Sequence, residues 1–195
     1  LKTHEKKFIK NYFNSQIFFF FTPLSVDPGH PFPFISNLST SLGVSLTQSK
    51  TGDDDKIFAR VKIPKLIDQW IQIEESNQYI HLIEVIQAYV NDLFPEMKVT
   101  GTILFKVTRN ADSDREDDDA EDLLAMIEEE LRQRRFAEIV RLEVGPCTDP
   151  WLKNFLVKEL GLIQEDLYDM PSAFDISDFS LLNQKLTWSQ HKFSA

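Results

Sequence analysis

The fold is decided by the stretch Val99-Thr100-Gly101-Thr102-Ile103-Leu104-Phe105-Lys106-Val107. Every second residue shares one face of a β-strand, because successive side chains of a strand point to opposite sides of the sheet. No other alternating run in the chain is as long, so we expect a central strand here. Shorter alternating runs at 42–46, 57–63, 71–73 and 140–144 predict half-buried strands, and the turn-rich residues 49–55 allow the first two to pair antiparallel.

Apolar residues at helical spacing predict four helices, at about 4–15, 82–93, 118–135 and 150–160. The last is bracketed by Asp149 at its N-cap, Pro150 at its first position and Gly161 just past its end. The prolines between 22 and 33 predict an extended connector. We expect the irregular residues after 162 to cover the core. Together these elements predict an α+β fold, with helices packed on a mixed, largely antiparallel sheet.

Composition is that of one ordinary globular domain, with 195 residues and 42% hydrophobic content. No apolar run approaches the ~20 residues that a bilayer span needs, so membrane association is not indicated. The single cysteine, Cys147, is expected to be a small buried apolar residue, and it favours a reducing, cytoplasmic location. Leu1 in place of an initiator Met indicates a piece of a longer chain.

The net charge of −10 disfavours long-range attraction of polyanions, so nucleic acid is not an expected partner. The acidic excess lies in two segments, 53–55 and 112–122, which leaves a balanced charge elsewhere. Residues from Asp112 to Asp119 concentrate hard oxygen ligands, yet the glycine and the final acid of a calcium loop are replaced by Asp117 and Leu123. An acidic helix start in a solvated loop is the simpler interpretation. A metal-dependent hydrolase using Asp112 to Asp119 stays an alternative.

Motifs for nucleophilic or nucleotide chemistry are absent from the sequence: it has no Gly-x-Ser-x-Gly, no Walker loop and no Gly-x-Gly-x-x-Gly. The histidines and Cys147 show no zinc spacing. Arg109 and Asn110 end the longest strand, where an arginine fork could bind phosphate or carboxylate, although Arg109 could instead pair with the acids that follow it. His30, between Gly29 and Pro31, would be held rigidly and could equally serve a structural hydrogen bond.

The residues from Thr22 to Ser39 resemble the middle domain of bacterial-type polyphosphate kinases. Further landmarks of that family follow in order at 58–64, 93–95, 105–112, 121–124, 134–136 and 140–144, so the resemblance covers about 11–182. Such enzymes reversibly transfer the terminal phosphate of ATP to polyphosphate, using Mg²⁺ and a phosphorylated histidine. The resemblance also implies an α+β fold and a dimer in which this domain takes part.

The family's catalytic histidine and its metal- and phosphate-binding arginines match no residue here, because they lie beyond this domain. We therefore expect no catalytic residue, no metal ligand, and no ATP or Mg²⁺ binding in this chain, which alone would be inactive. We expect residues 1–21 to be a helix and connector from a preceding domain, 22–182 to be the middle domain, and 183–195 to be a linker toward the missing catalytic domains.

The resemblance implies a structural and assembly role. Expected partners are the flanking domains, a second copy of the chain and, in the full-length enzyme, polyphosphate. His30, Arg60, Arg109 and Asn110 are candidates for a phosphate-facing or interdomain surface. A free-standing acidic protein-interaction module is the alternative of a different class.

Overall fold

The computed structural model describes residues 1–21, 24–26, 32–48, 56–74, 76–110, 136–171 and 178–186. Three predicted features lie outside these residues: the turn at 49–55, the acidic helix at 118–135, and His30.

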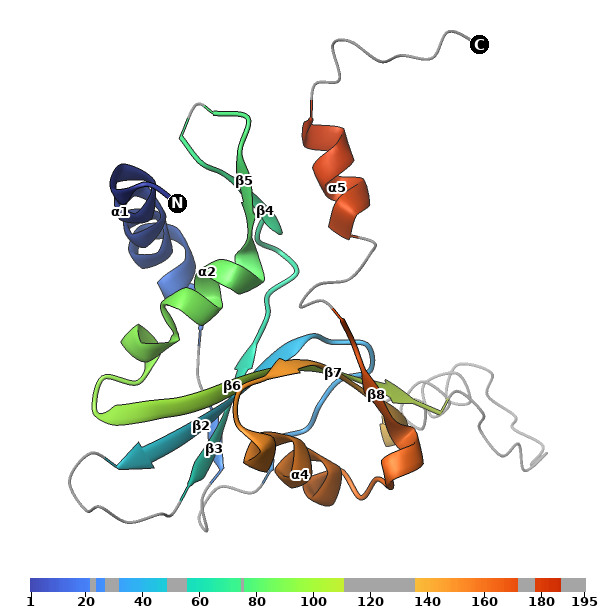
Figure 1. The fold of residues 1–195 in the computed structure, drawn as a ribbon. Helices are drawn as coiled ribbons and strands as arrows, with labels where there is room; N and C mark the ends of the chain where they lie inside the picture. The colour runs from blue at the N-terminus through green and yellow to red at the C-terminus, as the bar shows by residue number, and fades with distance from the viewer. Residues whose placement is uncertain are drawn as a thin grey trace, which may run out of the picture.

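A six-stranded sheet occupies the centre of the described structure, in the order β1-β3-β2-β6-β7-β8 (Figure 1). Its strands are β1 (Leu24–Val26), β2 (Ser41–Gln48), β3 (Ile57–Lys62), β6 (Met97–Arg109), β7 (Ile139–Cys147) and β8 (Leu167–Asp169). All neighbours pair antiparallel except β7 and β8, which are parallel. The prediction of an α+β fold with a mixed, largely antiparallel sheet is confirmed, as are the central strand and the antiparallel pairing of the first two predicted strands.

Helices cover both faces of this sheet. On one side lie α1 (Thr3–Tyr12), which continues as η1 (Phe13–Ile17) and η2 (Phe18–Phe20), and α2 (Leu82–Ala88) with η3 (Val90–Leu93). On the other side lies α4 (Pro150–Glu159), followed by η4 (Gln164–Asp166) (Figure 1). Helical structure therefore runs five residues further than the predicted end at 15. The second helix ends sooner than predicted as an α-helix, because Tyr89 leaves helical geometry at φ −116° and ψ 17°.

Two hydrophobic cores result, one on each face of the sheet. Ile9, Phe13 and Ile17 pack with the predicted apolar face of β2 and with α2. Leu152 and Leu156 of α4 pack on the opposite face. Side chains from residues 1–21 are therefore part of this core. The expectation that these residues come from a preceding domain stays a prediction.

The expectation that β2 and β3 are half-buried is wrong, since both faces of these strands are covered. Ser41 and Ser45 of β2 are as buried as Leu42, and Phe58 of β3 lies in the second core. Small residues on that face of β2 permit the close packing: a Cβ on Gly43 would lie 2.9 Å from the Phe58 ring. The alternating pattern predicted that the small residues of β2 face solvent, whereas they are buried in close contact with the second core.

The signals predicted for α4 are confirmed. Asp149 accepts a hydrogen bond from the N–H of Trp151 at 3.1 Å, and Gly161 takes a left-handed φ of 67° past the helix end. Burial alone would raise the pKa of Asp149, but hydrogen bonds from Lys56 and Trp151 outweigh it and hold that pKa below its ordinary value. Gly101 is needed opposite this cap, because a Cβ there would lie 2.4 Å from the Cβ of Asp149.

The predicted strand at 140–144 is present as β7, but each of its faces departs from the expectation at one residue. Leu142 and Val144 are buried, but Val140 is 44% exposed. Glu143, expected to face water, is half-buried between Lys106 and Arg141, each 2.8 Å from one of its carboxylate oxygens. Ion pairing explains how a charged side chain is accommodated there.

Residues after 162 contain, besides η4, two described elements that the pattern did not predict. Strand β8 joins the sheet beside β7, and α5 (Asp178–Lys185) packs on the hairpin of β4 (Trp70–Gln72) and β5 (Tyr79–His81) instead of the core (Figure 1). The indole N–H of Trp70 donates to the carbonyl of Asp178 at 2.7 Å, and Lys185 pairs with Asp68 at 2.9 Å. Phe179 and Leu181 stay 47% and 42% exposed, contrary to the expected core covering.

Helix α5 crosses the domain boundary expected at 182, which stays a prediction. No helix within the described ranges combines the length and the apolar character needed to cross a bilayer.

Candidate functional site

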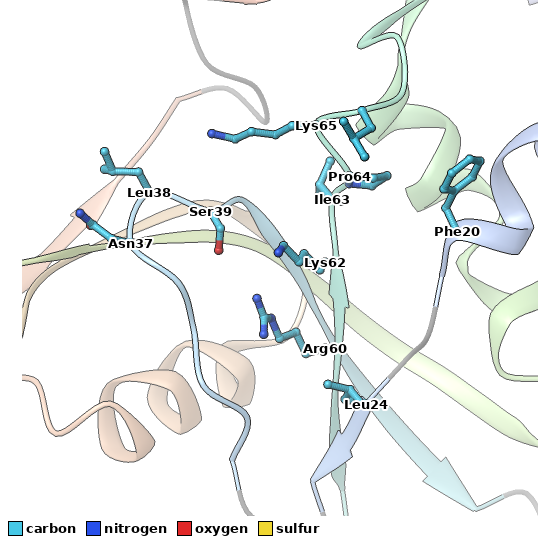
Figure 2. A pocket seen from close by; sticks show the side chains of 11 residues that line it. Phe20, Leu24, Asn37, Leu38, Ser39, Arg60, Lys62, Ile63, Pro64 and Lys65 are labelled. Carbon is cyan, nitrogen blue, oxygen red and sulfur yellow. The ribbon is translucent and has the colours of Figure 1, made fainter. Parts of the chain in front are cut away.

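A pocket of about 610 Å³ opens beside β3, where η2, β1 and the segment 37–39 approach one another (Figure 2). Its wall consists of Phe20, Leu24, Asn37, Leu38, Ser39, Arg60, Lys62, Ile63, Pro64, Lys65 and Leu66. Three of these side chains are cationic and none is acidic, so the described lining residues together carry a formal charge of +3. The rest of the wall is mainly apolar.

Arg60 forms the base of the pocket from the middle of β3, and it is only 6% exposed. Its Nε donates to Ser41 Oγ at 3.1 Å and its Nη1 donates to the Phe34 carbonyl at 2.9 Å. No carboxylate among the described residues lies within ion-pair distance of it. Burial lowers the pKa of the guanidinium, yet an arginine stays protonated at any physiological pH. Arg60 is therefore a buried cation with unused donors beside an open pocket.

Ser39 contributes a second unsatisfied group. The residue is 8% exposed, and its Oγ is buried with no hydrogen-bond partner among the described residues. Figure 2 shows the Ser39 hydroxyl, the Arg60 guanidinium and the Lys62 ammonium directed toward the same space. Buried polar atoms nearly always have a partner, so these groups together indicate a place for an acceptor-rich ligand.

The backbone beside Ser39 is strained and tightly held. Leu38 has a φ of 54°, which L-residues other than Asn, Asp and Gly seldom adopt. Its N–H donates to the carbonyl of Val107 at 2.9 Å, while Asn37 Oδ1 accepts from the N–H of Arg109 at 2.9 Å. Anchoring of residues 37 and 38 to β6 fixes the position of Ser39 at the pocket.

Arg109 holds the same segment from the other side, with a donor from each of its three guanidinium nitrogens bound to a backbone carbonyl of the protein. Its Nε and Nη2 donate to the Ile35 carbonyl at 3.1 and 2.8 Å, and its Nη1 donates to the Ala137 carbonyl at 2.6 Å. The guanidinium also lies 4.5 Å from the Phe34 ring centroid, and burial lowers its pKa. Arg109 is thus placed as a structural clamp.

The remaining predicted residues are not part of the pocket wall as described. The backbone N–H of Asn110 donates to the carbonyl of Glu138 at 2.8 Å, next to the clamp. His30 and the acids proposed to pair with Arg109 lie outside the described residues. Of the three sequence candidates that the structure describes, Arg60, Arg109 and Asn110, it brings only Arg60 to the pocket.

Sequence reasoning missed Ser39, Lys62 and Lys65. Lys62 shares with Arg60 one face of β3, which the period of two does indicate, and Lys65 follows directly after Pro64. Ser39 gave no signal, because only the folded chain shows that its hydroxyl is buried without a partner.

Cys147, expected to be a small buried residue, is half-buried at the end of β7. Its Sγ donates to the carbonyl of Asp149 at 3.0 Å, and burial raises the pKa of the thiol. A thiol held in its neutral form is a poor nucleophile.

The described pocket wall does not suit a magnesium ion, which takes oxygen ligands and carboxylates above all, because the charged groups among its described residues are all cations. Elsewhere in the described part of the chain, no three His, Cys, Asp or Glu side chains lie close enough to hold a metal. The hydrolase alternative at Asp112 to Asp119 falls outside the described residues.

Comparison with known proteins places the whole fold in one family. The model of the polyphosphate kinase middle domain matches residues 4–182. The chain is 37% identical over 186 residues to the polyphosphate kinase of Thermosynechococcus vestitus, covering 91% of this chain and 25% of that protein. It is 41% identical over 165 residues to the polyphosphate kinase of Streptomyces coelicolor, covering 85% and 22%.

A solved structure, the polyphosphate kinase of Porphyromonas gingivalis, superposes with a TM-score of 0.70 over 92% of this chain and 25% of that chain. At 16% identity, this likeness supports the fold alone. The chain spans about a quarter of the length of these relatives. With a family model that matches almost its full length and relatives above a third identical, this chain belongs to the polyphosphate kinase middle-domain family.

Proposed function

We propose that this chain is the structural middle domain of a polyphosphate kinase, where it positions the flanking domains and takes part in subunit assembly. The whole enzyme would reversibly transfer the terminal phosphate of ATP to polyphosphate, with Mg²⁺ and a phosphohistidine carried outside this chain. The observation that carries the proposal is the match of residues 4–182 to the middle domain alone, over about a quarter of each relative.

The environment of the described histidines supports a non-catalytic role. His81 Nδ1 accepts a hydrogen bond from the N–H of Ile83 at 3.2 Å, and its Nε2 lies 3.2 Å from Asp178 Oδ2. His81 is completely buried, so an incoming phosphate could not reach it. His4 is exposed, 3.8 Å from the Glu74 carboxylate, and no cationic group of the described residues is paired with it to stabilise a transferring phosphoryl group.

Exposed apolar side chains support contact with a further part of the enzyme. Phe19 and Phe20 of η2 are 79% and 58% exposed, and Leu66 is 96% exposed. Phe20 and Leu66 both line the pocket described above, so they form an apolar rim around its cationic base. Large exposed apolar groups typically mark interfaces, and flanking domains are the first partners we propose for this rim, with a second copy of the chain as a further partner.

The single cysteine and the proposed use of ATP support a cytoplasmic enzyme.

The decisive experiment supplies Mg²⁺ and γ-labelled ATP to this chain and, in parallel, to the protein extended by the flanking sequence of its gene. We expect acid-labile histidine labelling and polyphosphate synthesis by the extended protein only. Labelling of a histidine within the 195-residue chain would contradict the structural assignment. Failure of the extended protein to make polyphosphate would contradict the proposed enzyme.

A further inference from the structure

We propose that the pocket around Arg60, Lys62, Lys65 and Ser39 binds the phosphate groups of inorganic polyphosphate. The choice of polyphosphate as the ligand rests on the proposed function; the anion site itself rests on the geometry. The middle domain would then do more than position its neighbours, because it would hold part of the polymer.

The cations of the pocket have no acidic partner among the described residues. Arg60 is buried without a carboxylate among the described residues, and burying a cation is costly unless an anion compensates it. Lys62 and Lys65 likewise have no acidic partner in the described part of the chain. Lys56 and Lys185, in contrast, lie 2.7 and 2.9 Å from the carboxylates of Asp149 and Asp68. The pocket therefore gathers positive charge that the described protein does not neutralise.

The pocket also contains hydrogen-bond donors that the described protein does not use. Arginine carries five N–H donors, and the two bonds from Arg60 to Ser41 and Phe34 leave others unused. The Ser39 hydroxyl is buried and unpaired, and it points toward the same space as Arg60 (Figure 2). A phosphate offers several acceptor oxygens that can take an arginine fork, a hydroxyl and an ammonium at once. Such a group satisfies both the charge and the unpaired donors.

Size and wall chemistry favour a chain over a single ion. A volume of about 610 Å³ is larger than a single phosphate fills. Ile63, Pro64 and Leu24 contribute apolar wall, and an anion bound against them would lose part of its hydration, which strengthens its attraction to the cations. The net charge of −10 reflects an acidic excess in segments 53–55 and 112–122 of the sequence, whereas the described residues that line the pocket include no acid.

The test measures binding of orthophosphate, tripolyphosphate and long-chain polyphosphate to this chain by calorimetry. Chelator is present, so that no divalent ion can bridge polyphosphate to carboxylates. We expect the wild-type chain to bind the two chain-like probes more tightly than orthophosphate. The variant Lys62→Ala with Lys65→Ala should bind tripolyphosphate at least about tenfold more weakly, since each loses a charge-assisted contact. Ser39→Ala should weaken binding about threefold without lowering the thermal midpoint.

The matched control is Lys98→Ala with Lys158→Ala, which removes the same charge from exposed lysines outside the pocket. It should change the affinity less than about twofold. Circular dichroism and the thermal midpoint of every variant confirm that the fold is retained.

Three results would overturn the proposal. The first is no binding of any phosphate probe, and the second is equal weakening by the control pair. In the third, a polyglutamate peptide binds more tightly than tripolyphosphate and loses its binding in the pocket variant, which would assign the pocket to an acidic protein segment. Binding is measured on this chain and catalysis on the extended protein, so either proposal can fail without the other.

Discussion

The clamp around Arg109 and the pocket around Arg60 hold the same segment, 34–39, from two sides, and they use an arginine in opposite ways. Arg109 directs three N–H groups at the carbonyls of Ile35 and Ala137 and stacks on Phe34. Arg60 makes two hydrogen bonds and keeps its other donors beside an open cavity. Comparing the two arginines shows that a structural arginine donates most of its hydrogen bonds to the protein, whereas one available to a ligand has unused donors beside a cavity.

Their places in the sheet explain the difference. Arg109 is the last residue of β6, where the chain returning into β7 brings the Ala137 carbonyl within reach. Arg60 lies inside β3, whose outer neighbour β1 has only three residues. A short edge strand leaves the side chain of Arg60 next to loops, and between these loops the pocket opens.

The largest effect is expected for Arg109→Ala. The change leaves the partly buried carbonyls of Ile35 and Ala137 without these donors and removes a cation–π contact, so the free energy of unfolding should fall by about 3 kcal/mol. Urea denaturation at pH 7 measures it. Arg141→Ala is the control, because that side chain is 43% exposed and its ion pair should contribute less than about 1 kcal/mol. An equal decrease in the free energy of unfolding for both variants would contradict the assignment of Arg109 as a structural clamp.

Arg60→Met should cost less, which sharpens the comparison. Two hydrogen bonds are lost, but a buried cation without a described counter-ion is also removed, so the net change should stay within about 1 kcal/mol. The same urea titration applies. A loss as large as that of Arg109→Ala would show that the Arg60 donors are as fully committed as those of the clamp.

The sequence predicted the elements of the fold better than it predicted which of their faces are buried. Periodicity found β6 and the capping residues of α4, because a long alternating run and an Asp–Pro start are local signals. It failed for Ser41 and Ser45, whose burial depends on what packs on the far face of the sheet. Local patterns record which residues share a face, but not whether that face meets solvent.

The candidate site shows the same limit. Family resemblance singled out Arg60 and Arg109 together, and nothing in the sequence could tell which one the carbonyls of 34–39 and 137 would satisfy. Ser39 was missed because an unpaired hydroxyl is a property of three-dimensional surroundings. Elements could thus be predicted, whereas the division of labour between two arginines could not.

Titration of the buried His81 is expected to change the stability of the chain by a smaller amount. Desolvation lowers its pKa, although Asp178 and Glu84 act in the opposite direction. The unfolded chain therefore binds the proton more readily, so the stability that the neutral ring contributes is present above pH about 6.5 and is lost as pH falls below it. The thermal midpoint should decrease from pH 7.5 to 5.5. His81→Asn, which can still cap α2, should flatten this slope; an unchanged slope would exclude His81 as its source.

The smallest effect is expected for Leu38→Gly, and it separates strain that serves the pocket from strain that does not. Glycine accepts the φ of 54° at no steric cost but gains entropy in the unfolded chain, so stability should rise by at most about 1 kcal/mol. Glu74→Gly is the matched control, because Glu74 has a φ of 52° and does not line the pocket. Both variants should show similar small stability changes in urea. Only Leu38→Gly should weaken tripolyphosphate binding, by about twofold, since a freer backbone holds Ser39 less firmly toward Arg60. Equal affinity in the two variants would mean that the strained turn shapes the fold of 34–39 without positioning a donor for an anion.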